Sequence, residues 1–161
     1  MNRKRALLSL LVLAALSLAG CGSANSAHTS AYQAAQLDES GNIVIQKADI
    51  TSDATFLNYD SNGITVQLLA VRADDGTVRL AYNTCQSCNP SPRAYFVQQD
   101  DQFICQNCGN RYSAEDIGLT ALGCNPTTVD GVTETADTIT IEKAYLDSSA
   151  SRFTNWQGPT E

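Results

Sequence analysis

The sequence contains a single histidine, His28, and this scarcity excludes most sites that depend on imidazole. Ser-His-Asp hydrolysis, the helical zinc-protease motif and a Rieske iron–sulfur centre all need histidine in the site. His28 lies instead in a polar N-terminal stretch. No glycine-rich phosphate-binding loop is present either. The sequence therefore argues against a histidine-dependent hydrolase and favours a protein without catalytic residues.

Long apolar runs are also missing, except for residues 6–18, which are too few to span a bilayer comfortably. This run follows Arg3-Lys4-Arg5 and ends at Leu18-Ala19-Gly20-Cys21. Such an order is typical of a bacterial lipoprotein precursor, and is less typical of an ordinary secretory signal or a transmembrane helix. We therefore predict a signal peptide over residues 1–20 and lipidation (including palmitate) of Cys21. The lipid would hold the protein at the extracytoplasmic face of the cell membrane.

Basic residues are few. Beyond residue 20 the chain has seven Lys and Arg against seventeen Asp and Glu, a formal charge of −10. A surface of this sign is repelled by nucleic acid, so we expect no nucleic-acid partner. An acidic surface suits cationic partners or metal ions, and our hypothesis from the sequence is that this surface meets a partner protein.

The composition changes near residue 42. Residues 21–41 are rich in Ser, Ala and Asn without apolar periodicity, which predicts a flexible tether. Residues 42–157 then show the alternation and β-branched side chains of a mainly β domain. Strands are predicted at 43–45, 55–57, 64–71, 77–82, 94–98 and 102–104, and turns at 60–63, 73–76 and 99–101. Ser113 is predicted to cap a short helical turn. A weak repeat relates residues 42–48 to residues 138–144.

The cysteine pattern is the strongest feature of the sequence. Two C-x2-C pairs, Cys85/Cys88 and Cys105/Cys108, are separated by sixteen residues. A two-residue gap lets both thiolates of a pair face one ion, and a second pair completes a tetrahedron. Gly109 after the second pair, and Asn89 after the first, tolerate the positive φ that closes such a turn. The sequence therefore predicts a small sheet and hairpin domain with a four-cysteine double knuckle, like that of a zinc ribbon or a rubredoxin.

The pattern leaves the occupant of the four-cysteine site open. Four thiolates suit a single iron, a small iron–sulfur cluster or structural zinc, and two disulfides are the alternative without metal. The basic run is Arg-Lys-Arg and not a twin arginine, which favours export of the unfolded chain and so zinc, disulfides or assembly outside the cell. A cation such as Arg111 would balance the charge of four thiolates. Cys124 is the odd cysteine, interpreted as an additional metal or redox thiol or as a buried core residue.

Four stretches together resemble a known family. They are residues 70–77, 83–88, 103–111 and 123–126, and they are similar to the FtrD-like membrane iron–sulfur proteins. The resemblance extends from Asn42 to Trp156. It implies a metal or iron–sulfur site at the four paired cysteines and a link to iron-permease systems, in which such proteins are thought to move electrons. Many members carry this domain after several transmembrane helices, whereas this sequence has a lipoprotein signal.

These observations give three hypotheses of function. The first is a non-enzymatic electron-transfer or accessory lipoprotein of iron uptake, with an iron permease or a redox protein as its partner. The second is an interaction module in which Cys85, Cys88, Cys105 and Cys108 hold structural zinc. The third is a thiol–disulfide protein in which Cys124 is the resolving thiol.

Overall fold

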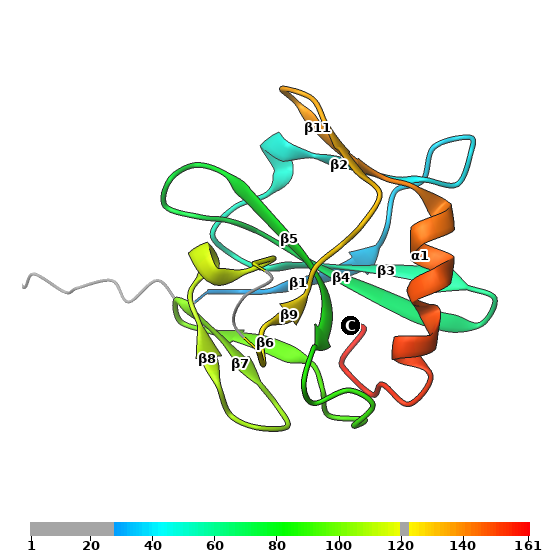
Figure 1. Cartoon of the computed structure of the whole chain (residues 1–161). Coiled ribbons are helices and arrows are strands. Elements are labelled where there is room, and N and C mark those ends of the chain that lie inside the picture. The colour runs from blue at the N-terminus through cyan, green and yellow to red at the C-terminus, as the bar shows by residue number, and fades with distance from the viewer. Residues whose placement is uncertain (1–27, 120–122) are drawn as a thin grey trace, which may run out of the picture.

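The computed structural model of the chain describes residues 28–119 and 123–161. The predicted signal peptide, Cys21 and the first part of the predicted tether lie outside these residues. Within them the domain is mainly β, as predicted, and consists of small sheets with one short helix (Figure 1). In this part of the chain no helix is both long and apolar enough to cross a membrane.

The central sheet has five strands in the order β1-β3-β4-β5-β9. Their bounds are β1 Ala31–Ala34, β3 Thr55–Ser61, β4 Ile64–Arg72, β5 Val78–Cys85 and β9 Pro126–Thr127. The two predicted turns join β3, β4 and β5 into an antiparallel meander. In the first turn Asn62 and Gly63 both have positive φ, 54° and 85°, as a two-residue hairpin turn requires. This meander carries the first cysteine pair at its end, because Cys85 is the last residue of β5.

Two three-stranded sheets flank the central one. One has the order β10-β11-β2, with β10 Val132–Glu134, β11 Thr138–Ile141 and β2 Ile43–Gln46. The other has the order β6-β7-β8, with β6 Phe96–Gln99, β7 Gln102–Cys105 and β8 Arg111–Tyr112. The two halves of the weak repeat are neighbours, since β11 pairs with β2 from Thr138↔Gln46 to Ile141↔Ile43. The repeated sequence therefore forms two strands of one sheet.

The helical elements are short. They are η1 Lys47–Asp49, η2 Ala114–Asp116, α1 Lys143–Ser149 and η3 Ala150–Phe153. The helical turn predicted after Ser113 is confirmed as η2, where the Ser113 hydroxyl donates to the Asp116 carboxylate and a capping box forms. Helix α1 was not predicted, and its buried Leu146 packs on the core beside the sheet.

Both faces of the central sheet are buried. On one face Leu68 and Tyr82 pack with β2, β11 and α1, and on the other Phe56 and Leu69 pack with the β6–β7 hairpin. The run Gln67-Leu-Leu-Ala-Val71 is fully buried because a strand covered on two sides loses the usual polar alternation. The hairpin that carries the second cysteine pair is therefore fixed against the sheet that carries the first.

The tether prediction is wrong for residues 31–34, which form strand β1 parallel to β3. The Tyr32 ring stacks on Phe56 with centroids 4.8 Å apart. His28 contacts Asp53 through Nδ1 at 2.5 Å and Asp101 through Nε2 at 2.9 Å. Burial lowers the pKa of His28, but the hydrogen bonds and charges of the two aspartates outweigh it and leave the pKa raised. The N-terminal segment is thus attached to the domain from His28 onward.

We expect this attachment to weaken with rising pH. The pKa of His28 is higher in the folded state than its usual 6.5. The stability that protonated His28 adds to this attachment is therefore complete below about pH 6.5, and it is lost as the pH rises through the raised pKa. We expect the hydrogen-exchange protection factors of the β1 amides to fall as the pH rises from 5.5 to 8.5. Protection factors are used because they already correct for the pH dependence of intrinsic exchange. His28→Gln should remove this pH dependence. An equal pH response in the variant would show that His28 is not its source.

Candidate metal centre

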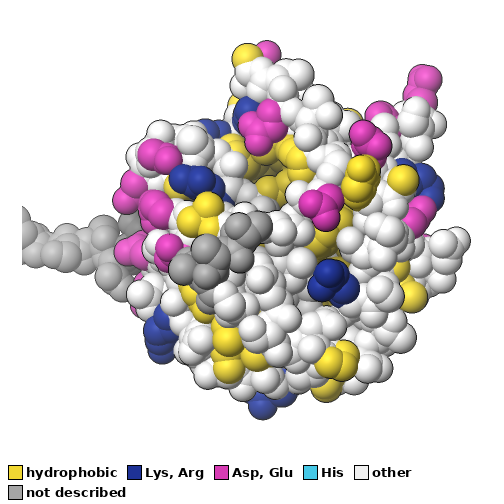
Figure 2. All heavy atoms as spheres, viewed as in Figure 1, with side chains coloured by type: hydrophobic (Ala, Val, Ile, Leu, Met, Phe, Trp, Pro, Cys, Tyr) yellow, Lys and Arg dark blue, Asp and Glu magenta, His cyan; other side chains and the backbone are white. Residues whose placement is uncertain are grey.

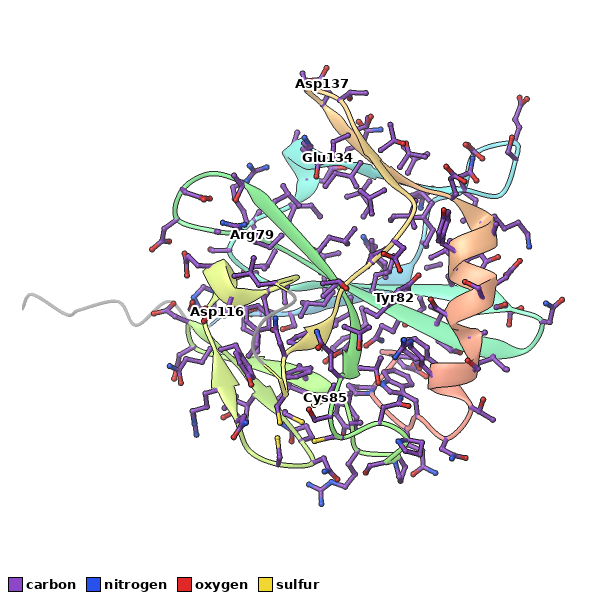
Figure 3. The ribbon with its side chains drawn as sticks, in the orientation of Figure 1. Arg79, Tyr82, Cys85, Asp116, Glu134 and Asp137 are labelled. Carbon is purple, nitrogen blue, oxygen red and sulfur yellow. The ribbon has the colours of Figure 1, made fainter. Side chains whose placement is uncertain are left out.

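The structure brings the four predicted cysteines together. Cys85 ends β5, Cys105 ends β7, and Cys88 and Cys108 lie in the turns that follow. Their four sulfur atoms all lie within 4.8 Å of one another. The sulfurs of Cys88 and Cys105, from different pairs, are 3.8 Å apart. Figure 3 shows the sulfur atoms gathered near the end of β5, where Cys85 is labelled. All five cysteines in the described part of the chain are free thiols.

The two turns share one backbone pattern. The N–H of Asn89 donates to the carbonyl of Cys85 at 3.1 Å, and the N–H of Gly109 donates to the carbonyl of Cys105 at 2.9 Å. Gly109 has a φ of +76°, as predicted. Asn89 does not have positive φ, and its peptide bond to Pro90 is cis. In the first turn the N–H of Cys88 also points at the Cys85 sulfur, 3.4 Å away.

Asn83, two residues before Cys85, fixes the distance between the two cysteine-bearing strands. Its side chain is fully buried and bonds both backbone groups of Phe96, as a neighbouring strand would. Oδ1 accepts from the N–H of Phe96 at 2.8 Å, and Nδ2 donates to the carbonyl of Phe96 at 3.2 Å. Phe96 in turn pairs with Cys105 across the β6–β7 hairpin. Nδ2 also donates to Oε1 of Gln67 at 2.6 Å. One amide group therefore sets the position of Cys105 relative to Cys85.

Sequence reasoning did not single out Asn83. The available signal was an amide side chain inside a β-forming stretch, where Asn is normally depleted. A buried polar group needs partners, so its position two residues before a ligand indicated a structural contact.

Further contacts join both knuckles to the segment that links them. The N–H of Cys85 donates to the carbonyl of Ala94 at 2.9 Å, and the N–H of Gln106 donates to the carbonyl of Tyr95 at 2.8 Å. At the surface the Ser91 hydroxyl donates to Oδ1 of Asn107 at 2.8 Å. The site is thus held by backbone and side-chain hydrogen bonds from both pairs.

The four thiols differ in their surroundings. Cys85 and Cys105 are buried, Cys88 is half-buried and Cys108 is exposed. Burial raises the pKa of Cys85 well above its usual range and raises the pKa of Cys105 to about 11. For Cys108, burial acts in the same direction, but the Asn110 N–H and neighbouring thiols outweigh it and lower the pKa. The two buried thiols are therefore neutral at pH 7 unless a cation replaces their protons.

The arrangement fits one tetrahedral ion. For metal–sulfur bonds of about 2.3 Å, the edge of a tetrahedron is about 3.8 Å, which matches the separation of the Cys88 and Cys105 sulfurs. Thiolates bound to different irons of a cluster lie farther apart, because an extra metal and bridging sulfides separate them. The whole set lies within 4.8 Å. The donor set therefore suits a single iron or a single zinc better than a multi-iron cluster.

Cys124 lies beside the group of four sulfurs, whereas Arg111 does not have the position that its suggested role requires. The backbone carbonyl of Cys124 accepts from the Cys85 thiol at 3.0 Å, and its side chain interacts with the Cys108 thiol, although its sulfur is not one of the four. Burial raises the pKa of Cys124. The guanidinium of Arg111 donates to Gln102 at 3.4 Å, at the turn end of the hairpin. Arg111 is thus directed away from the sulfurs.

Comparison with protein families matches residues 50–153 to the family described as "Membrane iron-sulfur containing protein FtrD-like". The match covers more than half of the chain and includes all four clustered cysteines. Neither the curated proteins nor the solved structures gave a match.

We predict that Cys105→Ser lowers metal content and stability together, because a structural metal contributes its binding energy to folding. Bound metal per chain and the melting temperature should both fall. Cys124→Ser is the matched control, since it also removes one thiol beside the site, and it should leave metal content largely intact. A Cys105→Ser protein with full metal content and an unchanged melting temperature would rule out the four-thiolate site.

Asn83→Ala should destabilise the metal-free protein by about 1–3 kcal/mol, because it leaves the buried N–H of Phe96 and the side-chain amide oxygen of Gln67 unsatisfied. Metal affinity should fall as well, since the two cysteine strands lose their spacer. Denaturant unfolding and metal titration measure the two effects. Asn107→Ala, at an exposed asparagine of the same site, should change stability by less than about 0.5 kcal/mol. Equal effects of the two substitutions would contradict the role of Asn83.

Proposed function

Because this chain belongs to the FtrD-like membrane iron–sulfur family, we propose that it is a non-enzymatic electron-transfer protein serving iron uptake. In this proposal Cys85, Cys88, Cys105 and Cys108 hold a single iron, which supplies the one-electron chemistry. The family supports an iron-related accessory role. The finer assignment rests on the compact group of four sulfurs.

The burial of the ligands supports electron transfer. Cys85 and Cys105 are enclosed by the core around Phe96 and Phe103, which keeps water from one side of the site. Cys108 is exposed, so the opposite side reaches the surface through a ligand atom. A site open on one side only gives a partner a short path to the metal while protecting the remaining ligands. Solvent exposure and hydrogen bonds to sulfur are also the means by which a protein sets the reduction potential.

The proposal places the protein at the extracytoplasmic face of the membrane. Its support is the sequence Leu18-Ala19-Gly20-Cys21, with Cys21 as the lipidated residue, together with the description of the family as membrane proteins. An iron permease or another redox protein would be the partner.

Structural zinc in an interaction module is the second candidate. The same observation favours it, since a compact tetrahedron of four sulfurs is also the arrangement of structural zinc sites. The thiol–disulfide reading has less support. Redox C-x2-C motifs normally open a helix, whereas both pairs here follow strands, β5 and β7.

An anaerobic visible spectrum with metal and sulfide analysis tests the proposal on the full-length chain, prepared in detergent from the cell envelope. We expect a coloured protein with about one iron per chain and no acid-labile sulfide. Two or more irons with sulfide would replace the single-iron site by a cluster. A colourless protein with one zinc would overturn electron transfer in favour of the structural module. Absence of both metal and free thiols would mean two disulfides.

A further inference from the structure

The surface around the metal centre is made of four segments that contact one another. We call residues 85–93, 105–110, 123–125 and 150–158 the cysteine face. The Ser87 hydroxyl donates to the carbonyl of Gly123 at 2.8 Å, and the Asn89 side chain donates to the carbonyl of Arg152 at 2.6 Å. The N–H of Gln157 donates to the carbonyl of Pro92 at 2.9 Å. These bonds, with the Ser91–Asn107 bond described above, make the face continuous around the exposed Cys108.

The cysteine face contains no Asp or Glu, although seventeen occur in the chain. It contains Arg93 and Arg152, two of the seven basic residues beyond residue 20. Figure 2 shows the same division on one side of the molecule. Asp and Glu lie over the upper part and along both sides, whereas the only charged side chains visible in the lower part, where the sulfurs of Figure 3 lie, are Lys and Arg. The strongly acidic surface predicted from composition is therefore absent around the metal centre.

The arginines of the cysteine face are also free of internal ion pairs. Elsewhere in the described chain three basic residues are paired with carboxylates, Lys47 with Glu134, Arg79 with Asp75 and Lys143 with Asp147. Of the other two, Arg72 donates to backbone carbonyls and Arg111 donates to Gln102 at the hairpin turn. By contrast, no ion pair within residues 28–119 and 123–161 involves the two exposed arginines of the face. Their charges remain available to a partner.

We propose that the cysteine face is a docking surface for a carboxylate-rich surface on a partner protein. This deepens the proposed function and rests on it, since carboxylates held by Arg93 and Arg152 would keep the partner on the face where Cys108 is exposed and electrons would pass. The acidic remainder of the molecule repels the same partner. Attraction at one face and repulsion elsewhere orient the encounter before contact.

A protein partner fits the face better than an anionic membrane does. The N-terminal segment joins the domain at His28, which contacts Asp101 in the turn of the β6–β7 hairpin. Cys105 lies at the opposite end of that hairpin. A membrane holding the N-terminal segment would therefore approach the hairpin turn, with its Asp100 and Asp101, and not the cysteine face.

Binding to poly-L-glutamate tests the proposal with the full-length chain in detergent, loaded with zinc so that the readout does not depend on iron. The assay is run near 0.1 M salt, where the Debye length is about 10 Å. Carboxylates far from the face are then screened, while contacts at the face itself are retained. We expect Arg93→Gln/Arg152→Gln to weaken binding by about tenfold. The control Gln33→Glu/Gln46→Glu makes the same change in net charge at exposed positions outside the face, and should alter affinity less than about twofold.

Equal losses in the two double variants would overturn the proposal, because net charge alone would then explain binding. So would a wild-type chain that fails to bind poly-L-glutamate. Binding to phosphatidylglycerol vesicles through the same arginines, without binding to poly-L-glutamate, would assign the face to the membrane. Thermal unfolding of each variant confirms that it is folded. The binding assay uses zinc-loaded protein, so its result does not depend on the metal analysis that tests electron transfer. Failure of the docking proposal can therefore be distinguished from failure of the electron-transfer proposal.

Discussion

The buried amide of Asn83 is the contact on which the metal centre depends. It joins the central sheet to the β6–β7 hairpin where no backbone ladder does so, and its backbone carbonyl also accepts from the indole N–H of Trp156 at 2.8 Å. The network continues through Gln67, which donates to the carbonyl of Pro159 at 2.8 Å, so the C-terminal segment is held by the same group of amides. Such a network is rigid when every member is paired and costly when one partner is lost. The spacing of the cysteine knuckles is therefore set by polar contacts inside an apolar core.

The charge pattern and the ligand set are physically consistent. Four thiolates around a divalent ion carry a net charge of about −2, and nearby carboxylates would raise the energy of that state further. The structure has none in the segments around the sulfurs, and places N–H groups there instead, such as that of Cys88. The same arrangement that lowers repulsion at the metal leaves Arg93 and Arg152 unpaired at the surface. In the proposed docking these two arginines, and not the thiolates, would attract the partner's carboxylates.

Much of this organisation could be predicted from the sequence because it is local. The hairpins on either side of the cysteine pairs follow from alternation and turn residues, and the pairs themselves from their spacing. What was missed depends on contacts between distant segments. Strand β1 has no apolar period of its own and forms only because β3, more than twenty residues later, offers an edge and the ring of Phe56. The position of Arg111 was missed for the same reason, since a side chain's direction depends on its register partner.

Strand β1 also changes the range over which the domain can move. With the proposed anchor at Cys21 and a tether ending at residue 41, an extended chain would reach at most about 70 Å from the membrane. Because strand β1 attaches the chain to the sheet from Ala31, only ten residue steps separate Cys21 from the sheet, and the reach of the anchor to the sheet falls to about 35 Å. Halving this radius reduces the hemisphere that the domain explores about eightfold, and raises the local concentration of any neighbouring membrane partner by the same factor. With the proposed anchor and docking surface, this four-residue strand would determine how often the cysteine face meets a partner at the membrane.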